Sequence, residues 1–542
     1  MMNIHLRNLS GAEFSINAQP SDTKQEESST MAQRVDTIIH ARWIVPVEPR
    51  DVYHEHHSLV IRDGVIVDIL PTKDISSKYV ADKEHDLSKH HALMPGLVNL
   101  HSHSPMTLLR GLCDGVELNE WLIHFMWPHE GKWMSPEFVR TGSRIAVSEM
   151  IKSGVTCFND MYFFPDVTAE VVDQVGMRGT VGAIIIQFPS AWASSSQEYI
   201  DKGLALIQKY EKHSRIRVVL APHATYTVGD EDLLRMKEIS ERYDTKVHIH
   251  LHETSFEVSE HKKNDQLGRS PIKRLVDLGM MNERLIAVHM TQLTDEDINI
   301  VASSGASVAH CPESNLKLGS GICPTSKLIR AGVNVGLGTD GAASNDDLDM
   351  LGEMRTSALV DKYKVEDPAL PGAEILRFGT MNGAKALGLD HLIGSLEVGK
   401  RADVIAVKLA ARPVYNPIIS LVYVGTNRVE YSWVDGRCIL DEGKLTIVDE
   451  STWEKEIDEW GEKIISWDRE RKSPDLKQIN TQIQTYLSSQ LKEEEKKDVR
   501  SQLEQWRSQL GSWKYFSQKD EEMTRQLDTL STDLTRLEKH IE

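Results

Sequence analysis

The sequence predicts an α/β protein: a (β/α)8 barrel (TIM barrel), a small composite β-sandwich domain made from both chain ends, and an added C-terminal α-helical tail. The barrel is predicted by short apolar runs that alternate with longer helical patterns between residues 94 and 395, as in βα units. Eight such runs fit the strands of a closed barrel, at residues 97–100, 156–159, 180–186, 217–221, 246–251, 285–288, 307–309 and 334–337.

The segments on either side of the barrel predict the β domain. Residues 33–93 and 396–450 each contain apolar runs with the character of strands, and each contains an Asp-Gly pair, at 63–64 and 435–436. Asp-Gly between apolar runs is a strong signal for a tight hairpin. Because each half is short, we expect one composite domain rather than two separate β modules.

The two ends of the chain depart from this pattern. Residues 1–32 are polar and rich in Ser and Glu, so we expect a disordered N-terminal extension. Tryptophan and isoleucine recur at helical spacing in residues 451–472, which predicts a helix packed on the barrel.

Residues 473–542 predict a helical or coiled-coil tail, because their apolar positions recur in steps of three and four. These positions are Val499, Leu503, Trp506, Leu510 and Trp513, followed by Met523, Leu527, Leu530, Leu534, Leu537 and Ile541. Two interpretations remain open: a helical pad on the tail's own subunit, or a surface for oligomerisation or partner binding.

The composition excludes several classes of function. A net charge of −19 argues against nucleic acid as the principal partner, because phosphate binding needs a basic surface. Five cysteines give no disulfide framework and fit a reducing compartment. No apolar run approaches the roughly 18 residues of a membrane span, and no secretory signal is recognisable. We therefore expect a cytoplasmic protein that binds neither nucleic acid nor membrane.

Ionisable side chains follow most of the predicted barrel strands. The C-terminal strand ends of such a barrel form its active-site mouth, and unpaired buried polar groups cost free energy. So many ionisable groups at one rim therefore predict a functional site. They are His101 and His103, Asp160, His223, His250 with Glu253, His289, His310 and Asp340.

His101 and His103 lie at the end of the first barrel strand. Residues i and i+2 of a strand point to the same face, so the two imidazoles project together, which suits a divalent metal ion. In the fifth strand His248, His250 and His252 also share one face, and their spacing alone leaves open which of them belongs to the site.

These motifs resemble the amidohydrolase superfamily, and within it the 5-methylthioadenosine/S-adenosylhomocysteine deaminases. The resemblance covers roughly residues 33–450. It rests on His-x-His at 101–103, His-Leu-His-Glu-Thr at 250–254, His289, Gly-Thr-Asp-Gly-Ala-Ala-Ser at 338–344, Leu-Arg-Gly at 109–111 and Ser-Asn-Leu-Lys-Leu-Gly at 314–319.

The resemblance implies one divalent metal ion per subunit, bound by His101, His103, His250 and Asp340. Zinc is the expected ion, and such nitrogen and oxygen ligands also accept iron(II) or manganese(II). The choice of His250 follows from Glu253 three residues later, which is the family's spacing. The fourth strand has no interior lysine that could bridge two metals, which favours a single ion.

The resemblance also implies the chemistry. Asp340 would take a proton from the attacking water, Glu253 would protonate a ring nitrogen of adenine, and His289 would stabilise the oxygen of the tetrahedral intermediate. The implied reaction is hydrolytic deamination of 5′-methylthioadenosine or S-adenosylhomocysteine to the inosine analogue and ammonia. Taken singly, Glu253 could instead be a helix-start carboxylate and His289 a core histidine.

The expected partner is a small-molecule nucleoside. Glu130 matches the position at which the resembling enzymes hold the ribose hydroxyls, and a carboxylate suits two vicinal hydroxyls. His223 and Ser344 are further substrate candidates, and Trp121 offers an apolar wall. The loop at 187–194 contains no arginine for a homocysteine carboxylate, which favours methylthioadenosine.

Other functions remain as alternatives: a guanine deaminase, a triazine hydrolase, or a non-catalytic scaffold that acts through the coiled-coil tail. Glu130 argues against triazines, which carry no ribose, and the intact set of ionisable residues argues against a scaffold. We also expect a homo-oligomer, a dimer or tetramer, in which the tail is one candidate contact.

Overall fold

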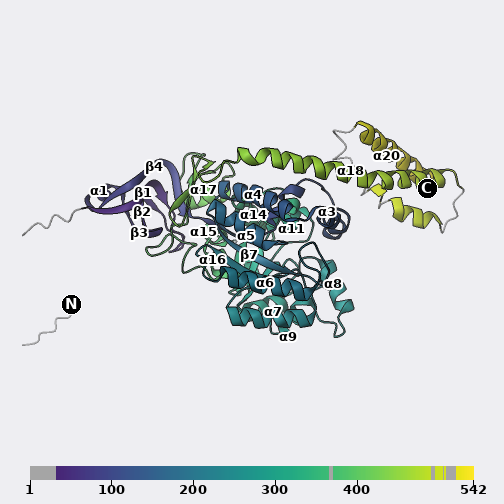
Figure 1. The fold of residues 1–542 in the computed structure, drawn as a ribbon, viewed down its shortest axis with the longest axis horizontal. Coiled ribbons are helices and arrows are strands. Elements are labelled where there is room, and N and C mark those ends of the chain that lie inside the picture. The colour runs from purple at the N-terminus through teal and green to yellow at the C-terminus, as the bar shows by residue number, and fades with distance from the viewer. Residues whose placement is uncertain (1–31, 365–369, 490–494, 504–505, 508–520, 542) are drawn as a thin grey trace, which may run out of the picture.

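The computed structural model describes residues 32–364, 370–489, 495–503, 506–507 and 521–541. Figure 1 shows a β-sheet at one end, the barrel with its helices in the middle, and a long helix that leads to the C-terminal helices at the other end. The predicted N-terminal extension lies almost wholly outside the described residues.

Eight parallel strands form the barrel in sequence order, and every predicted run is confirmed as a strand. Most strand residues are buried, as expected where side chains fill the barrel on one face and helices cover the other. The strands are β5 (Leu97–Ser102), β6 (Val155–Tyr162), β7 (Arg178–Ile185), β8 (Ile216–Pro222), β9 (Val247–Leu251), β10 (Leu285–His289), β11 (Ser307–His310) and β12 (Asn334–Leu337).

The last strand returns to the first just beyond the strand ends. The backbone N–H of Thr339 donates to Asn99 Oδ1 at 3.0 Å. A Cβ on Gly338 would lie 2.7 Å from the backbone nitrogen of His101, so only glycine allows this approach. The barrel therefore closes at the level of the predicted site.

Helices connect the strands and cover the barrel (Figure 1). Several begin at a Ser or Thr whose side chain accepts from a backbone N–H of the first turn, as at Ser135, Ser195 and Thr254. They include α4 (Pro136–Lys152), α5 (Pro165–Val175), α6 (Ser196–Tyr210), α7 (Asp230–Tyr243), α8 (Ser255–Asn264), α9 (Pro271–Asp277), α10 (Asp295–Ser304), α11 (Pro312–Lys317), α12 (Thr325–Arg330), α13 (Ala342–Asn345), α14 (Met350–Lys364), α15 (Gly372–Phe378), α16 (Met381–Ala386) and α17 (Pro417–Tyr423).

A second sheet is built from both chain ends, as predicted, so the fold class is confirmed. β4 joins the halves: it pairs in parallel with β1 and antiparallel with β13. All eight strands are bonded into one continuous sheet in the order β16-β15-β14-β13-β4-β1-β2-β3. They are β1 (Gln33–Ile44), β2 (His54–Arg62), β3 (Val65–Pro71), β4 (Tyr79–Pro95), β13 (Val404–Lys408), β14 (Arg428–Val434), β15 (Arg437–Asp441) and β16 (Lys444–Leu445).

Both predicted Asp-Gly turns are present, and they pack against each other. Gly64 and Gly436 have φ values of 72° and 73°, the left-handed conformation that such hairpin turns require. A Cβ on Gly436 would lie 2.9 Å from Gly64 Cα. The two halves of the sheet are therefore locked together at their turns.

A buried arginine ties this sheet to the barrel. Arg178, at the start of β7, donates to both carboxylate oxygens of Asp403, at 2.8 and 3.0 Å, and to Asp435 Oδ1 at 2.6 Å. Arg178 and Asp403 are almost fully buried, and a buried charge is tolerated only when it is well paired. The relative placement of barrel and sheet thus depends on this ionic group.

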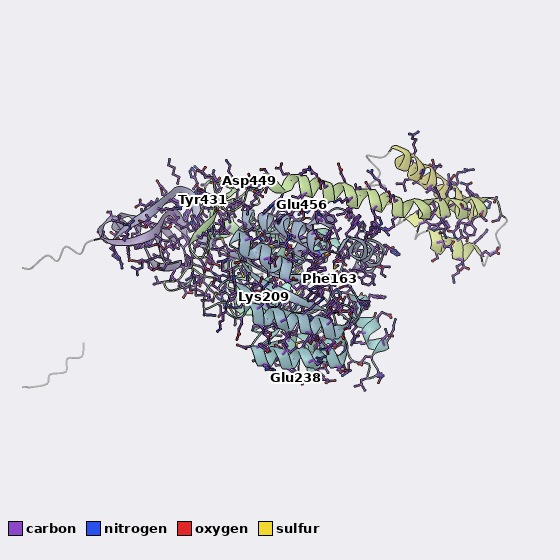
Figure 2. All side chains as sticks on the ribbon, viewed as in Figure 1. Phe163, Lys209, Glu238, Tyr431, Asp449 and Glu456 are labelled. Carbon is purple, nitrogen blue, oxygen red and sulfur yellow. The ribbon has the colours of Figure 1, made fainter. Side chains whose placement is uncertain are left out.

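One continuous helix, α18 (Ser451–Leu487), follows the sheet and crosses the expected boundary between residues 472 and 473 without a break. Its first turns lie along α4, where Glu456, labelled in Figure 2, accepts from Arg144 Nη1 at 3.1 Å. No helix in the described parts of the chain is long and apolar enough to cross a membrane.

The C-terminal helix α20 (Glu521–Ile541) packs on α18. Its apolar positions are covered within the chain, in a cluster with residues of α18 and of the segment 495–507. The buried members are Leu527, Leu530, Leu534, Leu537 and Ile541, with Ile479, Ile483, Val499, Leu503 and Trp506. Leu510, Trp513 and the side chain of Met523 lie outside the described residues.

Candidate active site

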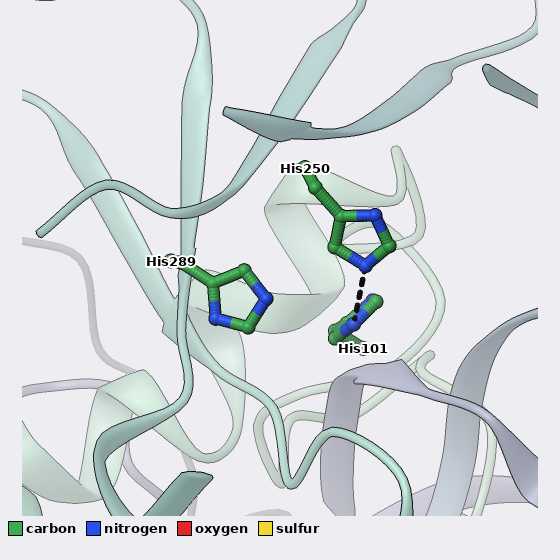
Figure 3. Close-up of side chains that lie close together, drawn as sticks. All are labelled: His101, His250 and His289. Carbon is green, nitrogen blue, oxygen red and sulfur yellow. Dashed lines mark hydrogen bonds between the residues drawn. The ribbon is translucent and has the colours of Figure 1, made fainter. Parts of the chain in front are cut away.

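Two groups of metal-binding side chains meet at the mouth of the barrel. The ligand atoms of His101, His250 and His289 lie within 4.8 Å of one another, and so do those of His101, His103 and Asp340. Figure 3 shows His250 and His289 directed toward His101, with His250 Nε2 3.3 Å from His101 Nε2. The structure therefore brings together all four residues predicted to bind a metal.

Asp340 follows β12 and faces two histidines. Its Oδ1 atom lies 3.1 Å from His101 Nε2 and 3.2 Å from His103 Nε2. Its Oδ2 atom accepts from the hydroxyls of Ser314 at 2.6 Å and Ser344 at 2.8 Å. Burial opposes ionisation, but the contacts with the two histidines hold the pKa of Asp340 well below its usual value, so the side chain is a carboxylate.

Backbone carbonyls orient two of the histidines. His103 Nδ1 donates to the carbonyl oxygen of Met161, and His250 Nδ1 donates to that of His223 at 2.7 Å. In each ring the Nε2 atom is then directed to the centre of the cluster. Such a partner on the far nitrogen is typical of metal-binding histidines.

The three histidines in and just after β9 have three different environments. His250 faces the cluster, whereas His248 lies behind it, with Nε2 3.0 Å from His101 Nδ1. His252 turns away and donates from Nδ1 to the carbonyl oxygen of Gln292 at 2.8 Å. The geometry thus separates residues that their spacing in the sequence could not.

The protonation states of His101 and His250 fit a metal site. Burial lowers the pKa of His101 to about 3 and holds that of His250 well below its usual value, so both rings are neutral, the form that binds metal. Burial also disfavours a charge on His103, but contact with Asp340 raises its pKa to about 9. Three imidazoles and one carboxylate around one point suit a divalent ion such as zinc.

Glu253 and His289 lie beside this cluster. Glu253 Oε2 is 3.8 Å from His289 Nε2, and Glu253 Oε1 accepts from the Ser320 hydroxyl at 3.2 Å. His289 Nδ1 lies 2.8 Å from Asn315 Oδ1, so it donates there and leaves Nε2 directed to Glu253. Burial raises the pKa of Glu253, as is common for a carboxyl group that gives and takes protons.

The backbone is strained at two of these residues. His289 has φ 72° and Asp340 has φ 64°, a left-handed conformation that costs a non-glycine residue about 1–3 kcal/mol. Such strain persists only where surrounding contacts impose it, and it clusters at functional sites. His289 is the last residue of β10, and Asp340 lies three residues beyond the end of β12.

A cavity of about 670 Å³ opens above the cluster. Three of the residues expected to contact the substrate, Trp121, Glu130 and His223, line it. Burial raises the pKa of Glu130 to about 7, and the Tyr162 hydroxyl and His103 partly offset this. Most of the remaining lining is apolar: Met106, Leu118, Leu122, Met126, Trp127, Met134, Phe163, Ile184, Ile186, Phe188 and Leu318.

Three of the singled-out residues have other surroundings. Ser344 is not among the cavity-lining residues and donates to Asp340 instead. Asp160 accepts from the backbone N–H and hydroxyl of Ser104 and so fixes the segment after His103. His310 is buried and does not line the cavity.

Sequence reasoning missed several supporting residues. Ser314 and Asn315 orient Asp340 and His289, and Ser320 contacts Glu253. The motif at 314–319 marked the first two as notable, but spacing alone assigned them no partner. Ser320, one residue beyond the motif, carried no signal.

The geometry agrees with comparisons to known proteins. A family model described as "Amidohydrolase family" matches residues 92–439. A 5-methylthioadenosine/S-adenosylhomocysteine deaminase of Saccharophagus degradans is 43% identical over 79% of this chain and 97% of its own length. A 5′-deoxyadenosine deaminase of Methanothrix thermoacetophila is 41% identical over 66% of this chain and 86% of its own.

Solved structures agree in fold. An adenosine deaminase from Xanthomonas campestris with bound zinc has a TM-score of 0.78 and 44% identity, covering 80% of this chain and 100% of that one. A zinc-bound atrazine chlorohydrolase of Arthrobacter aurescens has a TM-score of 0.72 at 22% identity, over 78% of this chain and 100% of that one. At this identity the second likeness concerns the fold alone.

Proposed function

The chain belongs to the amidohydrolase family, and from this premise we propose that it is a metal-dependent hydrolase that deaminates adenosine-type nucleosides. One observation carries the proposal: Glu253 and His289 lie beside the cluster of His101 and Asp340. Above this cluster is a cavity that Glu130 also lines. The products are the inosine analogue and ammonia.

His101, His103, His250 and Asp340 would hold one divalent metal ion per chain, with zinc as the expected ion. A metal ion held by these residues would lower the pKa of water from about 15.7 to about 7 and so would supply hydroxide at neutral pH. Asp340 Oδ1, which faces His101 and His103, is placed to accept the proton that the attacking water loses.

Glu253 and His289 would act on the substrate. Glu253, whose pKa burial raises, delivers a proton to the purine ring nitrogen next to the carbon under attack. His289, whose ring Asn315 orients, would stabilise the oxygen that develops negative charge at that carbon. Asp340 would pass the proton it took from water to the exocyclic amino group, the C–N bond would break and ammonia would leave. The hydroxyl proton of the tetrahedral intermediate would return to Glu253, which leaves the 6-oxo product.

Glu130 and His223 would bind the sugar and Trp121 the apolar surface of the nucleoside. An ionised Glu130 can accept hydrogen bonds from both ribose hydroxyls, which a carboxylate does better than a neutral group. Glu130 lines the same cavity as Glu253 and His289. Ser344 is better assigned to orienting Asp340 than to the substrate.

The cavity favours an apolar group at the 5′ position, such as methylthio. Neither lysine nor arginine occurs among the described residues that line it. An adjoining cavity does contain Arg269 and Arg274, but each already contacts a carboxylate, Asp265 Oδ2 at 2.8 Å and Asp230 Oδ1 at 2.6 Å. A homocysteine carboxylate would therefore have to displace an ion pair.

An ammonia-release screen of the purified, metal-loaded protein tests the proposal. We expect turnover of 5′-methylthioadenosine, 5′-deoxyadenosine and adenosine, with weaker turnover of S-adenosylhomocysteine. Guanine or triazine turnover without nucleoside turnover would contradict it, and so would a protein inactive on all of them. A homo-oligomeric state and a cytoplasmic location stay predictions.

A further inference from the structure

One continuous helical segment forms a wall of the cavity. It comprises α2 (Leu118–Glu120), η3 (Trp121–Met126) and α3 (Trp127–Trp133), and residues 118–133 are called the wall segment below. The middle part is a π-helix, a wide and rarely used helical turn that often marks functional sites. One face of the wall segment lines the cavity, and Glu130 belongs to that face.

The other face packs on α18, which comes from the far end of the chain. His129, the neighbour of Glu130, is fully buried, and its Nδ1 atom donates to the Phe125 carbonyl oxygen at 2.6 Å. Its Nε2 atom lies 3.4 Å from Asp468 Oδ1 on α18. The Trp467 ring stands edge-on to His129, with 5.1 Å between the ring centroids.

A second polar contact reaches the π-helical turn itself. Arg471, one turn beyond Asp468 on α18, donates from Nη2 to the His124 carbonyl oxygen at 3.0 Å. The same nitrogen lies 3.2 Å from Asp468 Oδ1. One carboxylate oxygen thus contacts both His129 and Arg471, and through them it is linked to α3 and to the π-helical turn η3.

Asp468 is only 1% exposed. A carboxylate so deeply buried is costly unless its partners are charged or donate hydrogen bonds, and its removal leaves those partners poorly satisfied. The apolar cluster around it, in which Ile464 of α18 lies with Trp121 and Phe125, would hold the helix near the wall without it. Apolar packing therefore holds α18 against the wall segment, and the carboxylate fixes the orientation of the two elements relative to each other.

We propose that Asp468 is a positioning residue, which holds His129 and thereby sets the orientation of Glu130 toward the ribose. The role given to Glu130 rests on the proposed function; the restraint of the wall segment by Asp468 does not. On this view α18 is part of the substrate site, although the cavity-lining residues include none of its side chains.

Asp468→Asn is the informative change, because it removes the charge and keeps the size of the side chain. We expect KM for adenosine to rise about tenfold, equivalent to about 1.4 kcal/mol of binding, with kcat within about twofold of wild type. Asp458→Asn, the same change at an exposed position of α18, is the matched control and should alter neither constant.

A double-mutant cycle separates positioning from general destabilisation. If Asp468 acts through Glu130, Asp468→Asn should have little further effect on KM for adenosine in a Glu130→Gln background. Additive effects in the cycle, or a loss confined to kcat, would overturn the proposal.

Hydrogen exchange gives a readout that does not depend on activity. Peptides covering residues 121–133 should exchange faster in Asp468→Asn than in wild type or Asp458→Asn, while barrel strands stay unchanged. Arg471→Gln, which removes the contact with the His124 carbonyl, should accelerate the same peptides. Faster exchange without nucleoside turnover in any variant would retain the positioning role and reject the proposed function. Unchanged exchange in both variants would reject the positioning role itself.

Discussion

Asp340 and His101 are joined twice. The Asp340 backbone N–H donates to the His101 carbonyl oxygen at 3.0 Å, and Asp340 Oδ1 lies 3.1 Å from His101 Nε2. The first contact joins the ends of the first and last barrel strands, and the second belongs to the candidate metal site. Closure of the barrel and assembly of the site therefore depend on the same pair.

The metal should be bound in a ratio of about one per chain, and chelation should abolish activity and lower the melting temperature. His250→Ala removes one ligand and should lower the metal content. His252, just beyond the end of the same strand, turns away from the cluster, so His252→Ala should leave the metal content unchanged. Elemental analysis of both variants checks this, and two tightly bound equivalents in wild type would contradict a single-ion site.

Glu253→Gln should lower kcat at least ~100-fold, because an amide cannot deliver the proton. Metal content should stay the same, since Glu253 is not one of the proposed ligands. Glu238→Gln, on the exposed side of α7 and labelled in Figure 2, is the control with unchanged kcat. Activity of Glu253→Gln within a few-fold of wild type would assign the proton transfer to another group.

Glu130→Gln should raise KM for nucleosides by about tenfold or more and hardly affect any turnover of free adenine. A carboxylate accepts from two hydroxyls, whereas the amide offers only one accepting oxygen. Steady-state kinetics on adenosine and 2′,3′-dideoxyadenosine measures the difference. Equal losses on both would show that Glu130 supports the cavity rather than the sugar.

Glu257 predicts a pH-dependent stability. Burial raises the pKa of Glu257 to about 8, although its carboxylate accepts from the backbone N–H of Glu253 at 2.7 Å. A raised pKa means that the folded chain favours the protonated carboxyl group. The contribution of Glu257 to the free energy of unfolding is therefore complete below pH 4.5 and is lost as the pH rises through about 8. Relative to wild type, Glu257→Gln should gain unfolding free energy over this window, by at most about 1.4 kcal/mol per pH unit.

Denaturant unfolding at a series of pH values between these limits measures this gain. The exposed Glu238→Gln variant should show a constant difference from wild type across the same series. A constant difference for Glu257→Gln as well would show that its carboxyl group titrates alike in the folded and unfolded chains.

A chain that ends at Lys472 should fold and stay active. It keeps Asp468 and Arg471 and loses the helices whose apolar side chains cover one another. Because those side chains are buried within one chain, we expect the same oligomeric state as for the full chain. Light scattering and one kinetic assay check both points, and a change in subunit number would give the tail a role in assembly.

The barrel strands could be predicted because a strand buried on both faces gives a continuous apolar run in the sequence, as in the first four residues of β10. The site could be located because strand ends of a barrel converge whatever the loops do. Spacing could not predict which of His248, His250 and His252 faces the cluster, since all three would lie on the same face of a strand. The His250 ring is oriented by its hydrogen bond to the His223 carbonyl oxygen, and such a bond is not visible in the linear sequence.

The structure of the C-terminal region was harder to predict, because contacts between distant residues are not visible in the linear sequence. The periodicity of the tail leucines predicted helices but not whether they cover their own chain or another. The contact between Asp468 and His129 joins residues far apart in the sequence, and neither stands in a motif. A boundary was expected between residues 472 and 473, yet α18 continues through it.

The split sheet has a consequence for biosynthesis. Strand β4 is made early, but its neighbour β13 is translated only after the whole barrel. Until then β4 has an unpaired edge, and such edges attract other strands. During synthesis the edge of β4 therefore stays unpaired until β13 has been made. A chain that ends before β13 should aggregate rather than fold into a smaller active enzyme.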